Sequence, residues 1–195
     1  TLCDSISDAV FLIDNETGQI LEVNSTAVAM YGYTRDELLQ LRNTDLSAQP
    51  DETQRATQSG LTQVPLRYHR KKDGTVFPVE ITATHLVWRG RSVHIAAIRN
   101  ISERQRAERM WQAMYDISEA AHATTSLEEL GAAIHGIIQG LMPARNLYIA
   151  LLDRESGEVS FPYYLDEWRQ QPQPRKGTRG ITEYVLRLGA PLLAS

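Results

Sequence analysis

Cysteine is almost absent from this chain of 195 residues, and long hydrophobic runs are missing. A single cysteine, Cys3, excludes an internal disulfide and a thiolate metal cluster. No apolar stretch approaches the ~18 residues that a membrane span needs. Acidic residues (24) outnumber basic ones (20), which argues against a broad basic surface for nucleic acid. We therefore expect a cytoplasmic globular protein, with no membrane segment in this fragment and no nucleic-acid partner.

Signals for secretion and for catalysis are missing as well. The segment 1–4 has no basic region followed by an apolar stretch, so we expect no signal peptide. The first residue is not methionine, which suggests a piece of a longer protein. No local catalytic signature is visible, and neither His122 nor His135 precedes the acidic residue that typically follows a phospho-accepting histidine. We expect this chain not to be an enzyme.

Hydrophobic alternation and turn residues predict an α+β fold for the first hundred residues. Two apolar runs, 9–13 and 19–23, indicate antiparallel strands. Two short helices follow, one ending at Gly32 and one opened by a capping box over 34–37. The polar stretch 43–63 is expected to be loop with at most one short helix. Three further strands complete a five-stranded antiparallel sheet with small helices on one face: 64–70, 76–88 and 92–101.

Two turns predict the register of the last three strands. Asp73-Gly74 and Arg89-Gly90 each fit a two-residue type I′ hairpin turn. Counting from these turns places Glu80 between Arg67 and Arg99 in one cross-strand row. The same register predicts this core face: Val64, Leu66, Tyr68, Val79, Ile81, Ala83, Ala96 and Ile98. The opposite face is too apolar to stay in water, so we expect it to be covered: Leu86, Trp88, Val93, Ile95 and Ile101.

Several motifs stand together in this region: Asp8-Ala9-Val10-Phe11-Leu12-Ile13-Asp14, Val23-Asn24, Tyr31-Gly32-Tyr33-Thr34-Arg35-Asp36-Glu37-Leu38-Leu39, His69-Arg70-Lys71-Lys72-Asp73-Gly74-Thr75-Val76-Phe77-Pro78-Val79-Glu80, and Arg99-Asn100-Ile101-Ser102-Glu103-Arg104. With the order of the elements, they resemble a PAS domain over residues 5–101. The resemblance implies a sensory domain with a small-molecule pocket between sheet and helices. It also implies a C-terminal helix that passes the signal on.

Candidate pocket residues follow from this resemblance. His85 and His94 face each other in the predicted register and could bind a metal or sense pH, but no third ligand converges from the sequence, so we favour two ordinary histidines. We expect no haem, because 43–63 holds no His, Cys or Met, and no covalent flavin, because Cys3 lies outside the core. The cofactor, if any, is not identified. The residues expected near any ligand are Met30, Tyr31, Leu46, Tyr68, His85 and His94, with core packing as their alternative role.

A heptad pattern follows the predicted sheet, over a connecting helix at 102–122. It is typical of a parallel coiled coil in a homodimer, or of a surface helix packed on its own domain. The seam residues are Ala107, Met110, Met114, Ile117 and Ala121. Asn100 and Ser102 stand where PAS proteins usually carry Asp and Thr. These two residues can still cap the following helix, whereas any ion pair made by the usual Asp is lost. The candidates for signal transmission are Arg67, Glu80, Arg99, Asn100 and Ser102.

The remaining residues, 123–195, resemble the first half of a GAF domain. An amphipathic helix ends before Pro143, and two strands follow around 147–152 and 158–164. A short helix after Gly180 and a strand from Pro191 complete the pattern. Because such a partial sheet has an unpaired edge, we expect this unit to be completed by another chain, rearranged or poorly ordered.

The sequence thus predicts a sensory fragment of a larger signalling protein, of the sensor histidine kinase or diguanylate cyclase type. Its own downstream output domain would lie outside these residues, and a small ligand or a partner would supply the input. The alternative is a PAS module without ligand that mediates protein–protein contact and dimerisation.

Overall fold

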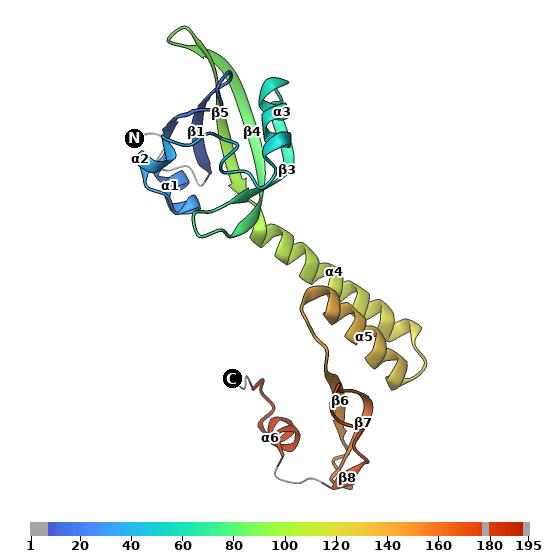
Figure 1. Cartoon of the computed structure of the whole chain (residues 1–195). Coiled ribbons are helices and arrows are strands. Elements are labelled where there is room, and N and C mark those ends of the chain that lie inside the picture. The colour runs from blue at the N-terminus through green and yellow to red at the C-terminus, as the bar shows by residue number, and fades with distance from the viewer. Residues whose placement is uncertain (1–7, 177–179, 193–195) are drawn as a thin grey trace. The chain divides into compact units, whose positions relative to one another are not determined.

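The computed structural model describes residues 8–176 and 180–192, which divide into two units (Figure 1). The first unit ends at Arg106 and the second begins at Ala107. This boundary lies inside one helix, α4 (Ser102–Ala123). The α+β class predicted from the sequence is confirmed, and each unit is described by itself below.

The first unit is built on a five-stranded antiparallel sheet with the strand order β2-β1-β5-β4-β3. Three helices, α1, α2 and α3, lie between β2 and β3 in the sequence. In Figure 1, α3 lies beside β3 and β4, and the pocket described below is lined by these three elements. The elements are β1 (Ala9–Asp14), β2 (Ile20–Val23), α1 (Ser25–Tyr31), α2 (Arg35–Leu38), α3 (Pro50–Gln58), β3 (Gln63–Arg70), β4 (Val76–Trp88) and β5 (Arg91–Asn100).

Local side chains explain where the first helices begin and end. The Asn24 side chain caps α1 by accepting a hydrogen bond from the Ala27 N–H, and also accepts one from the Val10 N–H of β1. Gly32 ends α1 in the left-handed conformation, at φ 75°. The predicted capping box at Thr34 is present at the start of α2. The Asn24 cap therefore also ties α1 to the first strand.

The core of the first unit is centred on aromatic rings. Tyr31 is fully buried, and its ring meets those of Phe11 and Phe77 edge-on with centroids 5.5 Å apart in both pairs. Leu38 from α2 and Val79 from β4 are also fully buried. The apolar alternation of β1 and β4 therefore serves packing against the short helices.

The β4–β5 hairpin has the register predicted from the sequence. Arg89 and Gly90 both have positive φ, 51° and 76°, as a type I′ turn requires. Glu80 pairs with Arg99, and His85 pairs with His94.

The predicted register of β3 is wrong by one residue near its turn. The Lys71 N–H bonds to the Thr75 carbonyl, and the Gly74 N–H to the Lys71 carbonyl, so the loop contains three residues and not two. Within this loop Gly74 has positive φ, at 86°, whereas Asp73 has negative φ, so the two residues do not form a type I′ turn. This geometry fits a type I turn followed by a left-handed glycine. A shift of one residue exchanges the two faces of a strand.

The shift corrects the predicted row of Arg67, Glu80 and Arg99. Arg67 lies opposite Val79, and its buried side chain forms an ion pair with Glu52 of α3. The row therefore exists only between Glu80 and Arg99.

The same shift corrects part of the predicted core face. Leu66 and Tyr68 are 44% and 40% exposed, while Arg67 and His69 are buried. A further irregularity lies between Val64 and Arg67, which returns Val64 to the inner side opposite Ile81.

The outer apolar face is only partly covered within the described chain. Val93 and Ile101 are buried, whereas Leu86, Trp88 and Ile95 stay more than one third exposed. The expectation that these three side chains are covered stays a prediction.

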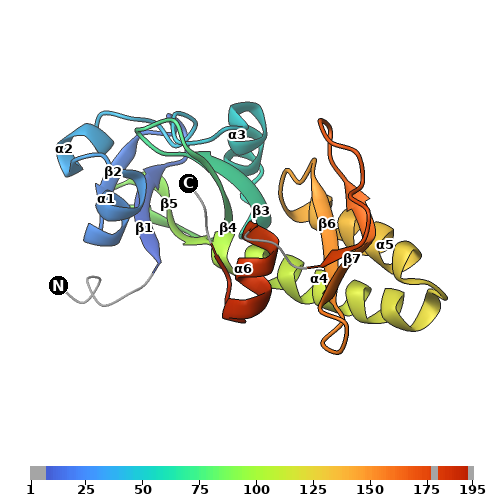
Figure 2. The ribbon, with the colours of Figure 1, turned by 90° about the horizontal axis from the view of Figure 1, so that it is seen from below.

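The second unit contains the rest of α4, a second helix and a three-stranded sheet with the order β6-β7-β8. Figure 2 shows α5 beside this part of α4. The short strand β8 was not predicted, and residues 191–192 are not in a strand, while 193–195 lie outside the described residues. The elements are α5 (Leu127–Leu141), β6 (Leu147–Leu152), β7 (Glu158–Leu165), β8 (Arg175–Lys176) and α6 (Ile181–Leu188).

Candidate ligand-binding site

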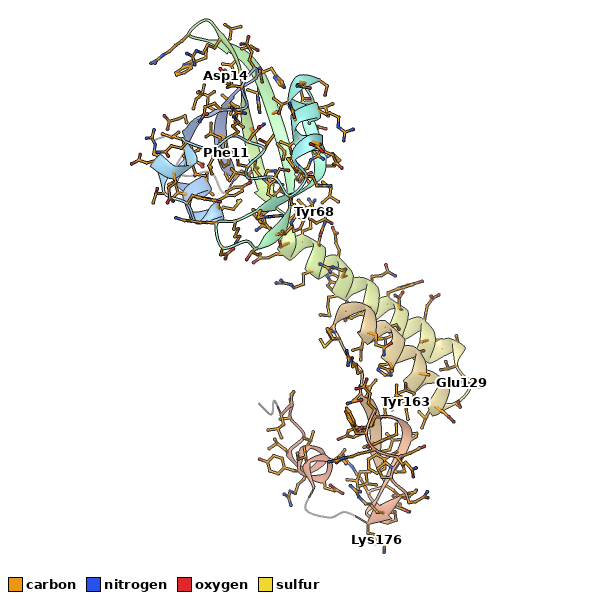
Figure 3. All side chains as sticks on the ribbon, in the orientation of Figure 1. Phe11, Asp14, Tyr68, Glu129, Tyr163 and Lys176 are labelled. Carbon is orange, nitrogen blue, oxygen red and sulfur yellow. The ribbon has the colours of Figure 1, made fainter. Side chains whose placement is uncertain are left out.

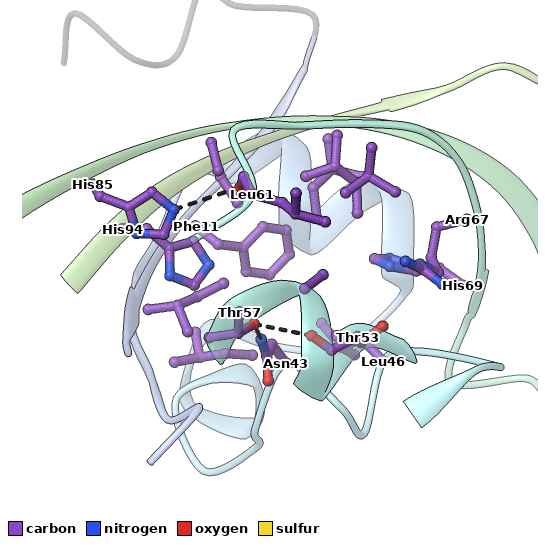
Figure 4. A pocket seen from close by; sticks show the side chains of 18 residues that line it. Phe11, Asn43, Leu46, Thr53, Thr57, Leu61, Arg67, His69, His85 and His94 are labelled. Atoms are coloured by element: carbon purple, nitrogen blue, oxygen red, sulfur yellow. Dashed lines mark hydrogen bonds between the residues drawn. The ribbon is translucent and has the colours of Figure 1, made fainter. Parts of the chain in front are cut away.

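A cavity of about 60 Å³ lies inside the first unit, between the inner face of the sheet and α3 (Figure 4). Most of its wall is apolar. That volume holds several waters, at roughly 10–15 Å³ each, or a ligand of a few heavy atoms. The apolar wall is formed by Phe11, Ile13, Ile20, Leu46, Ala56, Leu61, Val64, Ile81, Ala83, Ala96 and Ile98.

Polar side chains enter the cavity in separate groups, which Figure 4 labels. Arg67 and His69 come from β3, and His85 and His94 from the β4–β5 hairpin. Asn43, Thr53 and Thr57 form a third group, in which Asn43 Nδ2 donates to Thr57 Oγ1 and Thr57 Oγ1 donates to the Thr53 carbonyl.

His69 is a buried neutral histidine with an incomplete hydrogen-bond set. Its Nδ1 lies 2.6 Å from the Tyr31 hydroxyl. Burial, helped by the positive charge of Arg67, lowers the pKa of His69 to about 4, and burial also raises the pKa of Tyr31. Within the described part of the chain, His69 Nε2 has no hydrogen-bond partner.

The His85 and His94 rings lie together, with centroids 5.3 Å apart. His94 Nδ1 is 2.6 Å from Asn15 Oδ1, and burial, with the neighbouring His85, lowers the pKa of His94 to about 4. His85 Nε2 makes a long contact of 3.5 Å with the Leu61 carbonyl. Among residues 8–176 and 180–192, no group of three or more His, Cys, Asp or Glu side chains could hold a metal ion.

Three of the residues predicted for the pocket line it and three do not. Leu46, His85 and His94 belong to its wall. Tyr31 is buried in the core behind His69, to which its hydroxyl bonds. Tyr68 is turned outward by the register shift.

Met30 is the third predicted pocket residue that does not line the cavity. It packs against the core from α1 without reaching the cavity wall. Sequence reasoning missed Arg67 and His69 as pocket residues, because the assumed turn length placed both on the outer face. The signal that could have found them is the spacing of two basic side chains, i and i+2, on one strand.

At the exit of the sheet, β5 leads through Ile101 into α4. Asn100 Oδ1 accepts a hydrogen bond from the Ser102 N–H, the first residue of the helix. Arg104 in the first turn lies 3.4 Å from Glu80 of β4. Such an exposed pair is worth at most about 1 kcal/mol, yet it links helix and sheet directly.

Arg99, the other signal-transmission candidate on β5, is engaged elsewhere. Its guanidinium makes two hydrogen bonds of 2.9 Å to the carboxylate of Asp8. Arg99 thus ties the last strand to the start of β1.

The predicted dimer seam is largely exposed along α4. Met110 and Met114 are 51% and 55% exposed, Ala107 and Ala121 are exposed, and Ile117 is half-buried. Ala113, which was not assigned to the seam, is buried. The homodimer stays a prediction.

No helix within the described ranges combines the length and the hydropathy that a bilayer crossing demands.

These observations define the class of the first unit: an α+β domain whose antiparallel sheet and short helices enclose a small cavity. Residues 7–103 match the family model described as "PAS domain", and this segment is a PAS domain. The resemblance seen in the sequence is confirmed for this part, whereas the GAF-like resemblance of 123–195 stays a prediction.

Known proteins similar to this chain share about half of its length. A protein called "Methyl sulfide methyltransferase-associated sensor", from Methanosarcina acetivorans, is 24% identical over 115 residues, which cover 55% of this chain. The chain spans only 11% of that relative.

Two solved structures illustrate the same likeness. A PAS domain from a two-component sensor histidine kinase is 22% identical, with a TM-score of 0.46, over 51% of this chain and 89% of that one. The PAS domain of an HTR-like protein from Haloarcula marismortui is 23% identical, with a TM-score of 0.46, over 51% and 86%.

The buried histidine predicts a pH-dependent stability of the PAS domain. Between pH 6.5 and about 4, the unfolded chain binds a proton at His69 and the folded chain does not. The free energy of unfolding should therefore fall as the pH falls, by up to about 1.4 kcal/mol per pH unit from this group alone. The pKa of His94 is also lowered to about 4, so His94 makes the free energy of unfolding fall over the same pH range. Urea unfolding between pH 7 and pH 4.5 measures this slope.

The matched comparison for this prediction is His69→Gln, which removes one titrating group. Its slope between pH 6.5 and 4.5 should be shallower than that of the unmodified protein. Equal slopes in both proteins would show that His69 does not titrate differently in the folded and unfolded states.

Proposed function

We propose that this PAS domain is the sensory input of a larger cytoplasmic signalling protein and itself catalyses no reaction. A small ligand in the cavity would change the packing of β4 and β5, which line it, and thereby bias the start of α4. The observation that carries the proposal is the cavity between the sheet and α3, lined by a histidine whose buried Nε2 has no hydrogen-bond partner among the described residues. The Methanosarcina relative, which is named as a sensor, supports the same role.

The route from cavity to helix is short in this domain. Ile98 lines the cavity, and the strand that carries it ends at Asn100, two residues before α4. Glu80 lies opposite Arg99 and also reaches Arg104 in the first helical turn. A ligand acts on such an element only if it binds its alternative arrangements with different affinity.

The proposal also includes the oligomeric state, the second unit and the downstream output domain. We expect a homodimer that meets along the exposed α4 seam, a GAF-like unit at 123–195, and a histidine kinase or diguanylate cyclase as the downstream domain. The exposed methionines Met110 and Met114 support the seam.

The test is to purify the 195-residue protein and analyse it by native mass spectrometry, absorbance and light scattering. We expect a dimer that carries, or is thermally stabilised by, a small molecule. Ala56→Leu, which fills the cavity from α3, should abolish that stabilisation. Ala132→Leu, an exposed substitution on α5, should not. A protein that is empty and that no small molecule stabilises would refute the ligand-sensing role.

That outcome would favour the second candidate, a PAS module without ligand that binds a protein through its outer face. The partly exposed side chains of Leu86, Trp88 and Ile95 support this alternative. Dimerisation lost in Trp88→Ser and kept in Met114→Ser would favour it further.

A further inference from the structure

Two side chains that can present N–H donors to a ligand share one end of the PAS cavity. Arg67 and His69 stand two residues apart on β3, so both point to the same face of the strand. Both are buried and both line the cavity, where Figure 4 shows them on the same side. They are the polar groups that the register of β3 turns inward.

The proton on His69 can be assigned from its neighbours. The described residues give the Tyr31 hydroxyl one hydrogen-bond partner, His69 Nδ1, so the hydroxyl hydrogen is best placed on that bond. Nδ1 then accepts, and the neutral ring carries its proton on Nε2. This Nε2–H is buried and unpaired within the described chain. The end of the cavity therefore presents an N–H that needs an acceptor.

Arg67 adds further donors and a positive charge at the same place. A guanidinium has five N–H groups and no acceptor, and Glu52 is the carboxylate that pairs with it. The two partners differ in exposure: the Arg67 side chain is 10% exposed and that of Glu52 is 47% exposed. Glu52 can turn into water at little cost, whereas Arg67 stays in the wall. The guanidinium is thus positioned to exchange one carboxylate for another.

Apart from the His85–His94 pair and the group of Asn43, Thr53 and Thr57, the remaining wall is apolar and suits an alkyl group. Phe11, Leu46, Ile81 and Ile98 surround the space beyond the two donors. With a volume of about 60 Å³, it admits only a short chain. A ligand for this site needs an acceptor-only head and a small apolar tail.

We propose that the cavity binds a short aliphatic monocarboxylate, whose oxygens accept hydrogen bonds from His69 Nε2 and the Arg67 guanidinium while its tail packs against Phe11. The inference rests on the proposed sensory function and names its ligand class. The incoming carboxylate replaces Glu52 as the counter-ion of Arg67. Charge-assisted hydrogen bonds of this kind are stronger than those to a neutral carbonyl.

The test is calorimetric titration of the full 195-residue protein with acetate, propionate and butyrate, and with the matched amides. We expect the best carboxylate to bind about tenfold more tightly than its amide. Arg67→Gln should abolish this preference. Glu52→Gln should tighten carboxylate binding, because it removes the competing anion. The control Glu37→Gln alters an exposed ion pair with Lys72, outside the cavity wall, and should leave affinity unchanged.

The outcomes separate this inference from the proposed function. If the amides bind as well as the acids, or if Glu52→Gln weakens acid binding, the carboxylate assignment is wrong while a ligand-sensing PAS domain remains. If no compound binds and the purified protein carries none, both fail. Should Arg67→Gln not fold, as circular dichroism would reveal, the Glu52→Gln comparison still decides the matter.

Discussion

Replacing Phe11 by alanine should destabilise the PAS domain by about 3–5 kcal/mol. The Phe11 side chain is 1% exposed, meets Tyr31 edge-on and forms part of the cavity wall. Figure 3 marks its place on β1. Its removal would enlarge an existing void, which the surrounding strands cannot close. Since domains are stable by only about 5–15 kcal/mol, a large share of the stability would be lost. Urea unfolding followed by near-ultraviolet circular dichroism measures the change.

Leu66→Ala is the matched control on β3. Leu66 is exposed in the observed register, so the substitution should change the free energy of unfolding by less than about 0.5 kcal/mol. In the register predicted from a two-residue turn, Leu66 would be a core residue and its loss would cost about 2–5 kcal/mol. A large effect of Leu66→Ala would thus contradict the three-residue turn and the inward placement of Arg67.

Gly131→Ala should disrupt the packing of α5 against β7 in the second unit. A Cβ at Gly131 would lie 2.4 Å from Cβ and 2.5 Å from Cγ of Tyr163, far inside van der Waals contact. Tyr163, marked in Figure 3, cannot simply swing away, because its own Cβ is the nearest atom. Overpacking of this kind costs about 1–3 kcal/mol or more. Thermal unfolding and hydrogen exchange of α5 would report the loss.

Gly136→Ala, on the same helix, should act in the opposite direction. Nothing lies within 4 Å of a Cβ placed there. Alanine is favoured over glycine inside a helix by about 1 kcal/mol, so this variant should be slightly more stable. If both variants behaved alike, the contact between α5 and β7 would not be as described.

Much of the fold follows from local sequence signals. The capping box that begins at Thr34 was predicted and is present, and Asn24 and Ser126, residue types that favour the cap position, accept hydrogen bonds at the starts of α1 and α5. The β4–β5 register was predicted from Arg89-Gly90, because one conformation fits a turn in which both residues take positive φ. These features depend on a few neighbouring residues, so they can be read without tertiary information.

The candidate site was harder to predict, because it depends on a choice between two turns. Asp-Gly is compatible with a two-residue and a three-residue loop, and the sequence does not decide between them. The wrong choice placed Tyr68 inside and left His69 out. The predicted contact of Arg67 with Glu80 failed for the same reason, since Glu52, far away in sequence, is its partner. The bond between Arg104 and Glu80 was missed because it joins two separate elements.

The three-residue loop at Lys72–Gly74 has a consequence for how such pockets diversify. Deleting one residue from this loop would turn the two faces of β3 over, so that Leu66 and Tyr68 would replace Arg67 and His69 in the cavity wall without a substitution at any of these four positions. The length of this loop therefore determines which face of β3 lines the cavity. A single insertion or deletion can change the ligand preference of the cavity, where several point substitutions would otherwise be needed.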